Sequence, residues 1–382
     1  MNSNFLRSLA SIGILCLFFG FSQLNAQGCV AIRGFSSSSG NIGSGAALSE
    51  GDFLVGSNFR YFQSFRHFRG SEEETHRLEE GTEVINDSYF LDLTFNYGIT
   101  NRLYATLTLP FVSHVRSSMY EHGGNPPNGL GERHNTRSSG LGDLRIGAGY
   151  WLFKPGTKTF NYAIGAGIKL PTGDYEYMDT FYNQGPDRNQ SRYAVVDQSI
   201  QPGDGGWGFN LDFQGFHSLS HNLMLTTTLY YLFNPMETNG VLTRGGGSEF
   251  SVPDQYAALL GALYMPNIQG LSFYLGGRIE GVPATDLLGS SAGYRRPGYA
   301  VSVDPGVNYS INNLTMSLNV PIAVIRDRIQ SYEDKERTRE TGVFRQGDAA
   351  FADYLINFNV SYRFGSKKKM DIHPTMEEIE VN

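Results

Sequence analysis

Two stretches of this chain, from Tyr89 to Phe111 and from Leu314 to Val324, alternate between apolar and polar residues almost without error. Successive side chains of a β-strand point to opposite faces, so each stretch has one apolar face and one polar face. A tight turn at residues 99–101 separates two such runs, and the alternation then resumes. The pattern predicts an all-β chain built from antiparallel strands.

The N-terminus indicates the compartment. Arg7 precedes a weakly polar to apolar run from Leu9 to Phe21, and Ala26 ends a small-residue segment that resembles a cleavage site. The run is too short to span a bilayer as a helix, which takes about 20 apolar residues. We therefore predict a signal peptide over residues 1–26, removed from the mature protein.

The mature chain has no further apolar run of helical transmembrane length. The full sequence carries a formal net charge of −7, and loss of Arg7 makes the mature chain more acidic still. An acidic balance of this kind argues against a nucleic-acid partner.

Cys29 is the single cysteine of the mature chain, because Cys16 leaves with the signal peptide, so no intrachain disulfide can form. Two interpretations stay open: a tolerated thiol near the new N-terminus, or a site of lipid attachment. The preceding residues, Ala26, Gln27 and Gly28, lack the larger aliphatic residue that lipoprotein signals usually place first. This difference favours the plain thiol.

About 12 strand candidates follow, each roughly 9 to 15 residues long, against the 9 to 11 that cross a bilayer at a tilt. They are expected at residues 53–66, 84–97, 102–115, 141–153, 160–173, 206–217, 223–233, 255–265, 271–281, 299–310, 314–325 and 352–364.

Short and long connections alternate between these candidates. Short turns rich in Gly, Pro, Asn and Ser are expected at 98–101, 154–159, 218–222, 266–270 and 311–313. Long polar loops are expected at 67–83, 116–140, 174–205, 234–254, 282–298 and 326–351.

This regularity is typical of an up-and-down barrel whose two ends differ, and an even strand number leaves both termini on the short-turn, periplasmic side. The sequence therefore predicts a transmembrane antiparallel β-barrel in the cell outer membrane over residues 52–364. Residues 27–51 are then an N-terminal periplasmic segment, and residues 365–382 a polar periplasmic tail.

The alternation assigns faces on the fourth and fifth strands. Residues expected to meet lipid are Leu144, Ile146, Ala148, Tyr150, Leu152, Phe160, Tyr162, Ile164, Ala166, Ile168 and Leu170. Their alternates, Arg145 and Lys169 among them, then point into the lumen. A basic residue facing lipid at the bilayer midplane would cost about 2 to 4 kcal/mol, so the register is strongly specified. Aromatic residues near strand ends fit interfacial girdles: Tyr97, Tyr150, Phe160, Tyr231, Phe233, Tyr309, Tyr362 and Phe364.

Inward-facing charges are the candidate functional residues. The set expected to line the lumen or to contact a solute is Asp143, Arg145, Lys169, Arg278, Glu280 and Asp304. The first three could equally pair with one another across the fourth and fifth strands, and the last three could neutralise one another. Nearby glycines such as Gly147 and Gly167 indicate either wall curvature or room for a loop or solute.

The last strand predicts two partners of the barrel. Its apolar face ends in Tyr362 and Phe364, as in strands that the barrel-insertion machinery recognises, although a polar tail follows here. Its outward side chains would contact outer-membrane lipid.

Three segments also resemble a known family: residues 139–150 (SGLGDLRIGAGY), residues 165–174 (GAGIKLPTGD) and residues 205–207 (GGW). Over about residues 139–215 the chain is similar to the outer-membrane proteins grouped with the meta-pathway of phenol degradation. Members are described as transporters or channels for small, often aromatic, compounds. The resemblance implies a transport protein, but the phenol connection belongs to a few members and is not carried over.

Spacing argues against catalysis and metal binding. Outer-membrane lipid hydrolases place His and Ser two apart on one strand, and no histidine here has that neighbour. The pairs Ser113–His114 and His217–Ser218 are adjacent and point to opposite faces. No Cys/His spacing suggests zinc, and residues 202–206 offer one carboxylate among glycines, which predicts a plain turn. We expect neither an enzyme nor a cofactor.

Two functions stay open. The first is a channel or transporter for small solutes, hydrophobic or aromatic ones among them, through a lumen that side chains or a loop easily obstruct. The second is a non-transporting surface protein whose long loops bind a partner or ligand, with aromatic residues such as Tyr177, Tyr182 and Tyr193 at the contact. The polar, glycine-lined interior and the resemblance favour transport.

Overall fold

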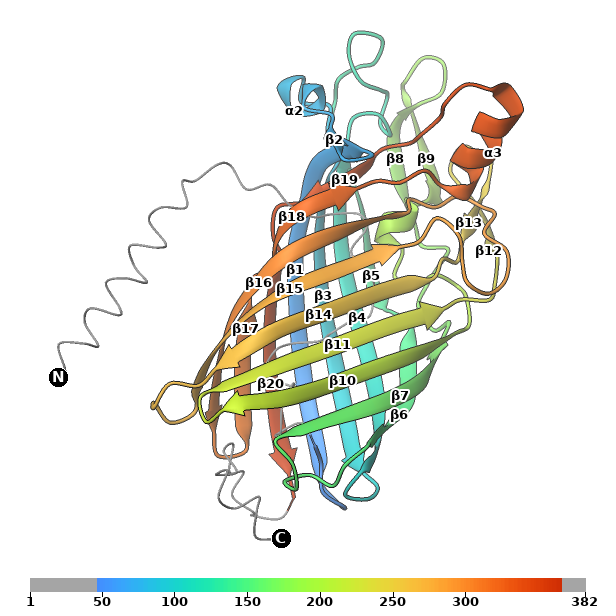
Figure 1. Ribbon diagram of the computed structural model, residues 1–382. Coiled ribbons are helices and arrows are strands. Elements are labelled where there is room, and N and C mark those ends of the chain that lie inside the picture. Colours follow the sequence, from blue (N-terminus) through green and yellow to red (C-terminus); the bar gives the residue numbers. More distant parts are fainter. Residues whose placement is uncertain (1–46, 366–382) are drawn as a thin grey trace, which may run out of the picture.

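A closed antiparallel β-barrel makes up most of the chain (Figure 1). The structure is a computed structural model and describes residues 47–365, so the predicted signal peptide, Cys29 and residues 366–382 of the predicted tail lie outside the described residues. The barrel has 12 strands. It closes where β1 (Phe53–Arg69) pairs with β20 (Ile356–Phe364), which places Phe53 opposite Phe364. The predicted fold class is confirmed.

Uninterrupted barrel strands lie close to their predicted positions. They are β1, β3 (Ile85–Gly98), β4 (Leu103–Ser118), β7 (Phe160–Leu170), β10 (Gly208–Ser220), β11 (Leu223–Phe233), β14 (Gln255–Tyr264), β15 (Leu271–Val282) and β16 (Gly298–Ile311). The fourth, eleventh and twelfth barrel strands are each interrupted, and they consist of β5 (His134–Leu141) with β6 (Leu144–Trp151), β17 (Leu314–Asn319) with β18 (Ile322–Asp327), and β19 (Ala349–Ala352) with β20.

Prolines border these interruptions. The N–H of Gly142 donates to the carbonyl of Pro110 (2.8 Å), and the N–H of Leu355 donates to the carbonyl of Pro321 (3.1 Å). Proline has no N–H to continue a ladder, so strand pairing stops or shifts beside it.

The fourth strand begins earlier than predicted, at His134 rather than at residue 141, so the predicted loop 116–140 is shorter than expected. The outward residues of β5 are Asn135, Arg137 and Ser139, all exposed and polar. Because this segment does not face lipid, it lacks the apolar alternation that marks the other strands.

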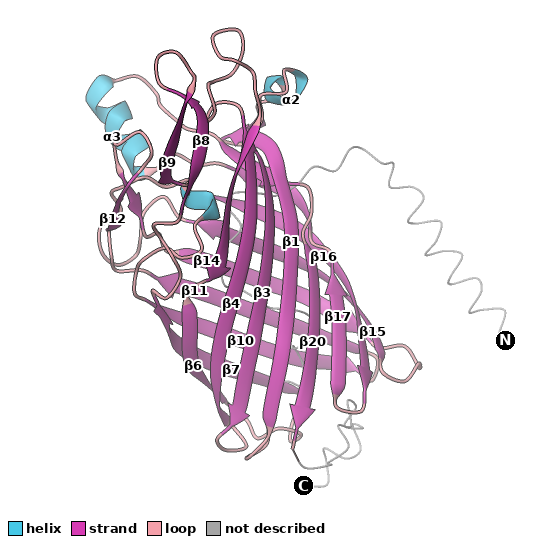
Figure 2. Cartoon of the chain, turned by 180° about the vertical axis from the view of Figure 1, so that it is seen from behind, coloured by secondary structure: helices cyan, strands magenta, loops and turns pink. Residues whose placement is uncertain are grey.

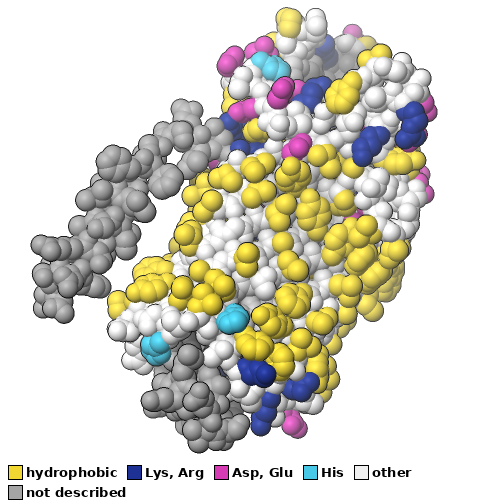
Figure 3. Space-filling model, in the orientation of Figure 1, with side chains coloured by type: hydrophobic (Ala, Val, Ile, Leu, Met, Phe, Trp, Pro, Cys, Tyr) yellow, Lys and Arg dark blue, Asp and Glu magenta, His cyan; other side chains and the backbone are white. Residues whose placement is uncertain are grey.

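The predicted register is confirmed on the fourth and fifth strands. Ile146, Ile164 and Ile168 are 51%, 54% and 52% exposed on the outer face, whereas Lys169 is buried inside. Apolar side chains also meet across strands, as where Leu91 lies opposite both Phe59 and Phe111. On the face seen in Figure 3, hydrophobic side chains cover the middle of the barrel, and charged groups lie near its two ends.

The two ends of the barrel differ as expected (Figures 1 and 2). Short turns lie at the end where the described chain stops, and the long connections at the other end form β2 (Glu72–Glu73), α2 (His76–Glu79), β8 (Met178–Gln184), β9 (Gln190–Val195), η3 (Gln198–Ile200), β12 (Thr238–Leu242), β13 (Glu249–Ser251) and α3 (Tyr332–Thr341). Residues 332–341 were expected in a loop, but a capping box at Ser331 and Asp334 starts a helix there. Among the described residues, no helix has the length and apolar character to cross a membrane.

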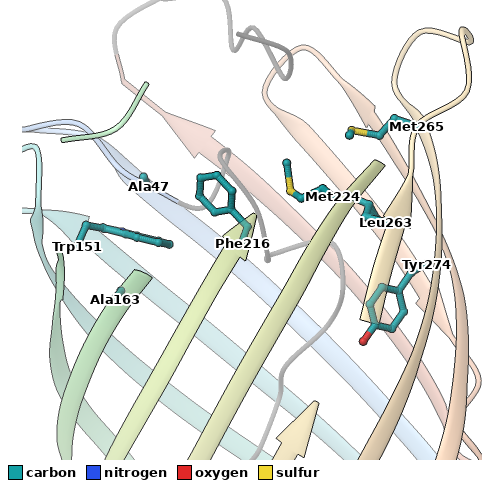
Figure 4. Close-up of a cluster of buried hydrophobic side chains, with 8 residues drawn as sticks. All are labelled: Ala47, Trp151, Ala163, Phe216, Met224, Leu263, Met265 and Tyr274. Carbon is teal, nitrogen blue, oxygen red and sulfur yellow. The ribbon is translucent and has the colours of Figure 1, made fainter. Parts of the chain in front are cut away.

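Apolar side chains fill the lumen at the short-turn end (Figure 4). This periplasmic apolar cluster consists of Ala47, Trp151, Ala163, Phe216, Met224, Leu263, Met265 and Tyr274. Ala47 precedes the first strand, so the chain packs against the inner wall before it enters the barrel. The interior is therefore less uniformly polar than the sequence predicted.

Candidate functional site in the barrel lumen

The break in the fourth strand lets a long connection enter the lumen. After β7 ends at Leu170, the chain turns inward, and both Gly173 and Asp204 donate their backbone N–H groups to the Asp143 carboxylate (3.1 and 3.0 Å). A Cβ added to Gly203 would lie 2.5 Å from the Gly173 carbonyl oxygen, so only glycine allows this close approach. Asp143 thereby holds residues 171–207, here called the inward segment, against the broken strand.

Lys169 makes the second contact with the inward segment. Its Nζ lies 2.5 Å from Oδ1 of Asp204 and is also bonded to the other carboxylate oxygen. Lys169 is only 3% exposed, so its charge needs a partner, and Asp204 supplies one. Residues 202–206 were predicted to be a plain turn, and this role of Asp204 was missed.

Arg145 lies beside Lys169 on the next strand, directly opposite it in the register. One guanidinium nitrogen lies 3.8 Å from an Asp92 carboxylate oxygen, and the charge of Arg145 also acts on the Tyr230 hydroxyl across the lumen. Even so, Nε and Nη2 of Arg145 have no hydrogen bond of ordinary geometry within the described chain.

These groups share one cleft inside the barrel, here called the lumen cleft. Its lining residues are Phe90, Asp92, Pro110, Val112, Gly142, Asp143, Arg145, Lys169, Pro202, Asp204, Leu232 and Gln255. Phe90, Pro110, Val112, Pro202 and Leu232 give it apolar surface, and its polar groups are the five ionic side chains and Gln255. A mostly apolar wall with a few convergent polar groups is typical of small-molecule sites.

A second charged cluster lines the opposite wall. Arg278 donates to Glu280 (2.8 Å), and Arg60 forms an ion pair with the same carboxylate (3.5 Å). Asp304 accepts a hydrogen bond from Asn319 (3.1 Å). The charges of Asp92 and Arg145 also act on Arg60, which links the two clusters into one belt across the lumen.

A buried ionic network covers the long-loop end of the barrel. Asp197, which caps η3, accepts hydrogen bonds from both terminal nitrogens of Arg296 (2.8 and 2.7 Å) and lies 3.6 Å from Arg116, which in turn pairs with Glu121. Burial raises the pKa of Asp197, but the two guanidinium groups outweigh it and hold that pKa well below its usual range. The network ties the connections after β4, β9 and β15 together over the lumen.

One group of acidic and histidine side chains resembles a metal site. His67, Glu74 and Asp348 place ligand atoms within 4.8 Å of one another. Both ring nitrogens of His67 are already bonded, to Asp348 (2.6 Å) and to the Val84 N–H (2.9 Å), and Arg77 pairs with both carboxylates. The arrangement is that of an ion-pair cluster rather than of a vacant coordination sphere.

The model of the family described as "Putative MetA-pathway of phenol degradation" matches residues 49–328. The chain belongs to this family. The match is far longer than the segment in which the sequence resemblance was noticed, and it includes all six predicted site residues.

Three solved structures align with the chain, and the first of them shares its fold. The COG4313 outer membrane channel from Pseudomonas putida F1 superposes with a TM-score of 0.55 at 13% identity, over 83% of this chain and 97% of that one. The toluene transporter TodX from P. putida aligns with a TM-score of 0.40 at 11% identity, over 90% and 99% of the two chains. The β domain of the Bordetella autotransporter BrkA aligns with a TM-score of 0.44 at 12% identity, over 82% and 100%. Among curated proteins, none matches the sequence.

This family member has the fold of an outer-membrane β-barrel, and its predicted site residues fall into two groups. Asp143, Arg145 and Lys169 come together in the lumen cleft, whereas Arg278, Glu280 and Asp304 lie on the opposite wall. The three do not form ion pairs with one another: Asp143 accepts from backbone N–H groups, Arg145 lies beside Asp92, and Lys169 pairs with Asp204. Whether any of the six contacts a solute stays a prediction.

Proposed function

We propose that this protein is an outer-membrane channel or transporter for small solutes with apolar or aromatic bodies. The observation that carries the proposal is the lumen cleft, in which Phe90, Val112 and Leu232 face the interior of the barrel beside ionic groups. Membership of the family and the shared fold of an outer membrane channel support it. In this proposal the partners are the solute, the lipid around the apolar band, and the insertion machinery that recognises the last strand.

The path through such a barrel is narrow. Barrels of 16 to 18 strands leave an aqueous channel, whereas smaller ones are filled by side chains or hold one small ligand. Here the two ends of the inward segment, around Gly173 and Asp204, lie in the lumen together with the charged belt and the periplasmic apolar cluster. We therefore expect a small or solute-dependent conductance rather than a large permanent one.

The test uses the full-length protein in two settings. Planar bilayers measure its conductance with and without solute, and vesicles with lipopolysaccharide in their outer leaflet, which slows passive entry, measure uptake of a labelled small aromatic compound. The proposal expects solute-dependent current and protein-dependent uptake. Folded protein that shows neither would overturn it.

The competing function is binding through the loops, and one observation favours it. On the β8–β9 hairpin Tyr182 is 43% and Tyr193 is 65% exposed. Exposed aromatic residues on loops are typical of contact sites. Altered uptake in the lumen variant Asp204→Asn, with wild-type uptake in Tyr193→Ser, would favour transport. Folded protein that shows no uptake but binds a partner or ligand, and loses that binding in Tyr193→Ser, would favour loop binding.

A further inference from the structure

Two buried side chains of the lumen cleft, Arg145 and Gln255, have polar atoms that make no hydrogen bond of ordinary geometry within residues 47–365, although one Arg145 nitrogen lies 3.8 Å from an Asp92 carboxylate oxygen. Arg145 offers Nε and Nη2 as donors, and Gln255 offers Oε1 as an acceptor. Leaving a buried donor or acceptor unsatisfied costs about 1 to 3 kcal/mol, more for a charged group. A native site usually offsets this cost with water or with a ligand.

The unbonded atoms of Arg145 and Gln255 together indicate which chemical group could bind between them. Arg145 needs an atom that accepts a hydrogen bond, and Gln255 needs one that donates. A hydroxyl group does both, as a water molecule does, so an alcohol oxygen can replace a bridging water without losing its bonds. A hydrocarbon cannot, and it would leave both groups unpaired.

The charges of the cleft act against an anionic solute. Asp92, Asp143 and Asp204 line it, against only Arg145 and Lys169. Lys169 is already bonded to both oxygens of Asp204. A solute carboxylate would be a fourth negative charge in a space with two positive ones, at low local dielectric, where like charges repel strongly.

We infer that the lumen cleft binds small uncharged solutes that combine an apolar body with a hydroxyl group. Arg145 donates to the hydroxyl oxygen, Gln255 accepts its hydrogen, and Phe90, Val112 and Leu232 contact the apolar body. This inference rests on the proposed transport function and names its substrate class.

Binding is measured by saturation-transfer NMR on the full-length barrel in detergent, with empty micelles as the blank. The probes are cyclohexanol, cyclohexanone, methylcyclohexane and cyclohexanecarboxylate, which share one ring. Cyclohexanol should bind tightest. Cyclohexanone, which accepts but cannot donate, should bind about 2- to 10-fold more weakly, as expected for one neutral hydrogen bond. The hydrocarbon and the carboxylate should bind more weakly still.

Variants separate the two contacts. Gln255→Leu should remove the preference for cyclohexanol over cyclohexanone while leaving cyclohexanone binding nearly unchanged. Arg145→Met should weaken both by about 10-fold or more, because bonds to a charged donor are stronger. Arg145→Lys keeps a positive charge beside Asp92, so a folded variant is available if the first one fails, and it should bind both probes with intermediate affinity.

Matched controls lie far from the lumen. Gln190→Leu on β9 and Arg339→Met on α3 change the same residue types at exposed positions and should bind all four probes as the wild type does. Equal binding of cyclohexanol and methylcyclohexane, preference for the carboxylate, unchanged selectivity in folded Gln255→Leu, or wild-type affinity for both probes in folded Arg145→Lys would each overturn the inference. If only the proposed transport function is wrong, the protein would still bind cyclohexanol selectively, but vesicles containing it would show no solute uptake.

Discussion

Lys169 and Asp204 form an ion pair inside the barrel although 35 residues separate them in the sequence. The residues between them leave the wall, form the β8–β9 hairpin above the barrel and return to the lumen. The pair therefore joins the start and the end of this connection inside the barrel.

Asp204→Asn should release the inward segment. Lys169 would keep a buried charge without its partner, and breaking a buried pair from one side costs about 3 to 5 kcal/mol. We expect a larger single-channel conductance in planar bilayers and a lower free energy of unfolding in urea.

The control for this variant is Asp187→Asn, an exposed acid in the same connection, which should change neither quantity. The double variant Lys169→Met/Asp204→Leu should regain most of the lost stability, because an apolar pair leaves no charge unpaired. A folded Asp204→Asn protein with wild-type conductance and stability would contradict the prediction.

Cysteine labelling tests the faces of the wall. In a background lacking Cys29, cysteine at Lys169 should react only with water-soluble reagents small enough to enter the lumen, whereas cysteine at the neighbouring Ile168 should react with probes dissolved in lipid. Ile168 is 52% exposed on the outer face and Lys169 is 3% exposed, so the two sites should give opposite results. Lipid-phase labelling at position 169 would reverse the register.

The sequence predicted the barrel wall well because lipid imposes a simple rule on it. Ile146, Ile164 and Ile168 must alternate with inward polar residues, and this alternation is visible without any partner. The rule no longer applies where a strand extends beyond the lipid, so the alternation does not predict β5.

The site was harder to predict because its contacts join distant segments. Asp204 reaches Lys169 only after the inward segment has folded, and Asp197 meets Arg296, 99 residues away. Spacing along one strand could not reveal such pairs. Nor could it show that His114 lies 3.0 Å from Ser88, because the two residues belong to different strands, β4 and β3. A lone acid in a glycine-rich connection after an inward lysine is the signal that could have identified Asp204.

The connections after β4, β9 and β15 cover the long-loop end of the barrel and are here called the cover. We expect the cover to lose stability in acid because of His122. This side chain is buried in the connection after β4, with its ring stacked on Phe181 at 5.5 Å between centroids. Burial lowers the pKa of His122 to about 4; Glu121 and Asp179 raise it, and His134 and Arg244 lower it further.

An open cover would leave His122 with the ordinary histidine pKa of 6.5, whereas the closed cover lowers that pKa to about 4. Between these two pH values His122 is therefore less protonated in the closed cover than in the open one. The stability of the closed cover is fully present above that window and is lost as the pH falls through it. Hydrogen exchange in residues 119–133, corrected for the intrinsic pH dependence, should accelerate across the window. His122→Phe should remove this acceleration, and His76→Asn on α2 should keep it. Equal acceleration in all three proteins would refute the role of His122.

Asp197→Asn should loosen the same cover at neutral pH. The pKa of Asp197 is depressed, so its contribution to stability is present above the ordinary aspartate pKa of about 3.9 and is lost only as the pH falls toward the lower folded value. The amide removes the charge that Arg116 and Arg296 share, leaving two buried cations together. We expect faster limited proteolysis of residues 283–297 at pH 7, whereas Asp187→Asn should be cut at the wild-type rate.

Phe216→Ala tests the periplasmic apolar cluster. Phe216 is buried in the lumen with Trp151 at 6.3 Å between ring centroids, so truncation should cost about 3 to 5 kcal/mol of stability and leave a cavity. Because the cavity lies in the lumen, conductance in planar bilayers should rise. Phe213 lies on the same strand three residues earlier and stacks on Tyr162 (5.7 Å) on the outer face, so Phe213→Ala should leave conductance unchanged. If both variants conduct like the wild type while Phe216→Ala is destabilised, the cluster supports the wall without closing the path.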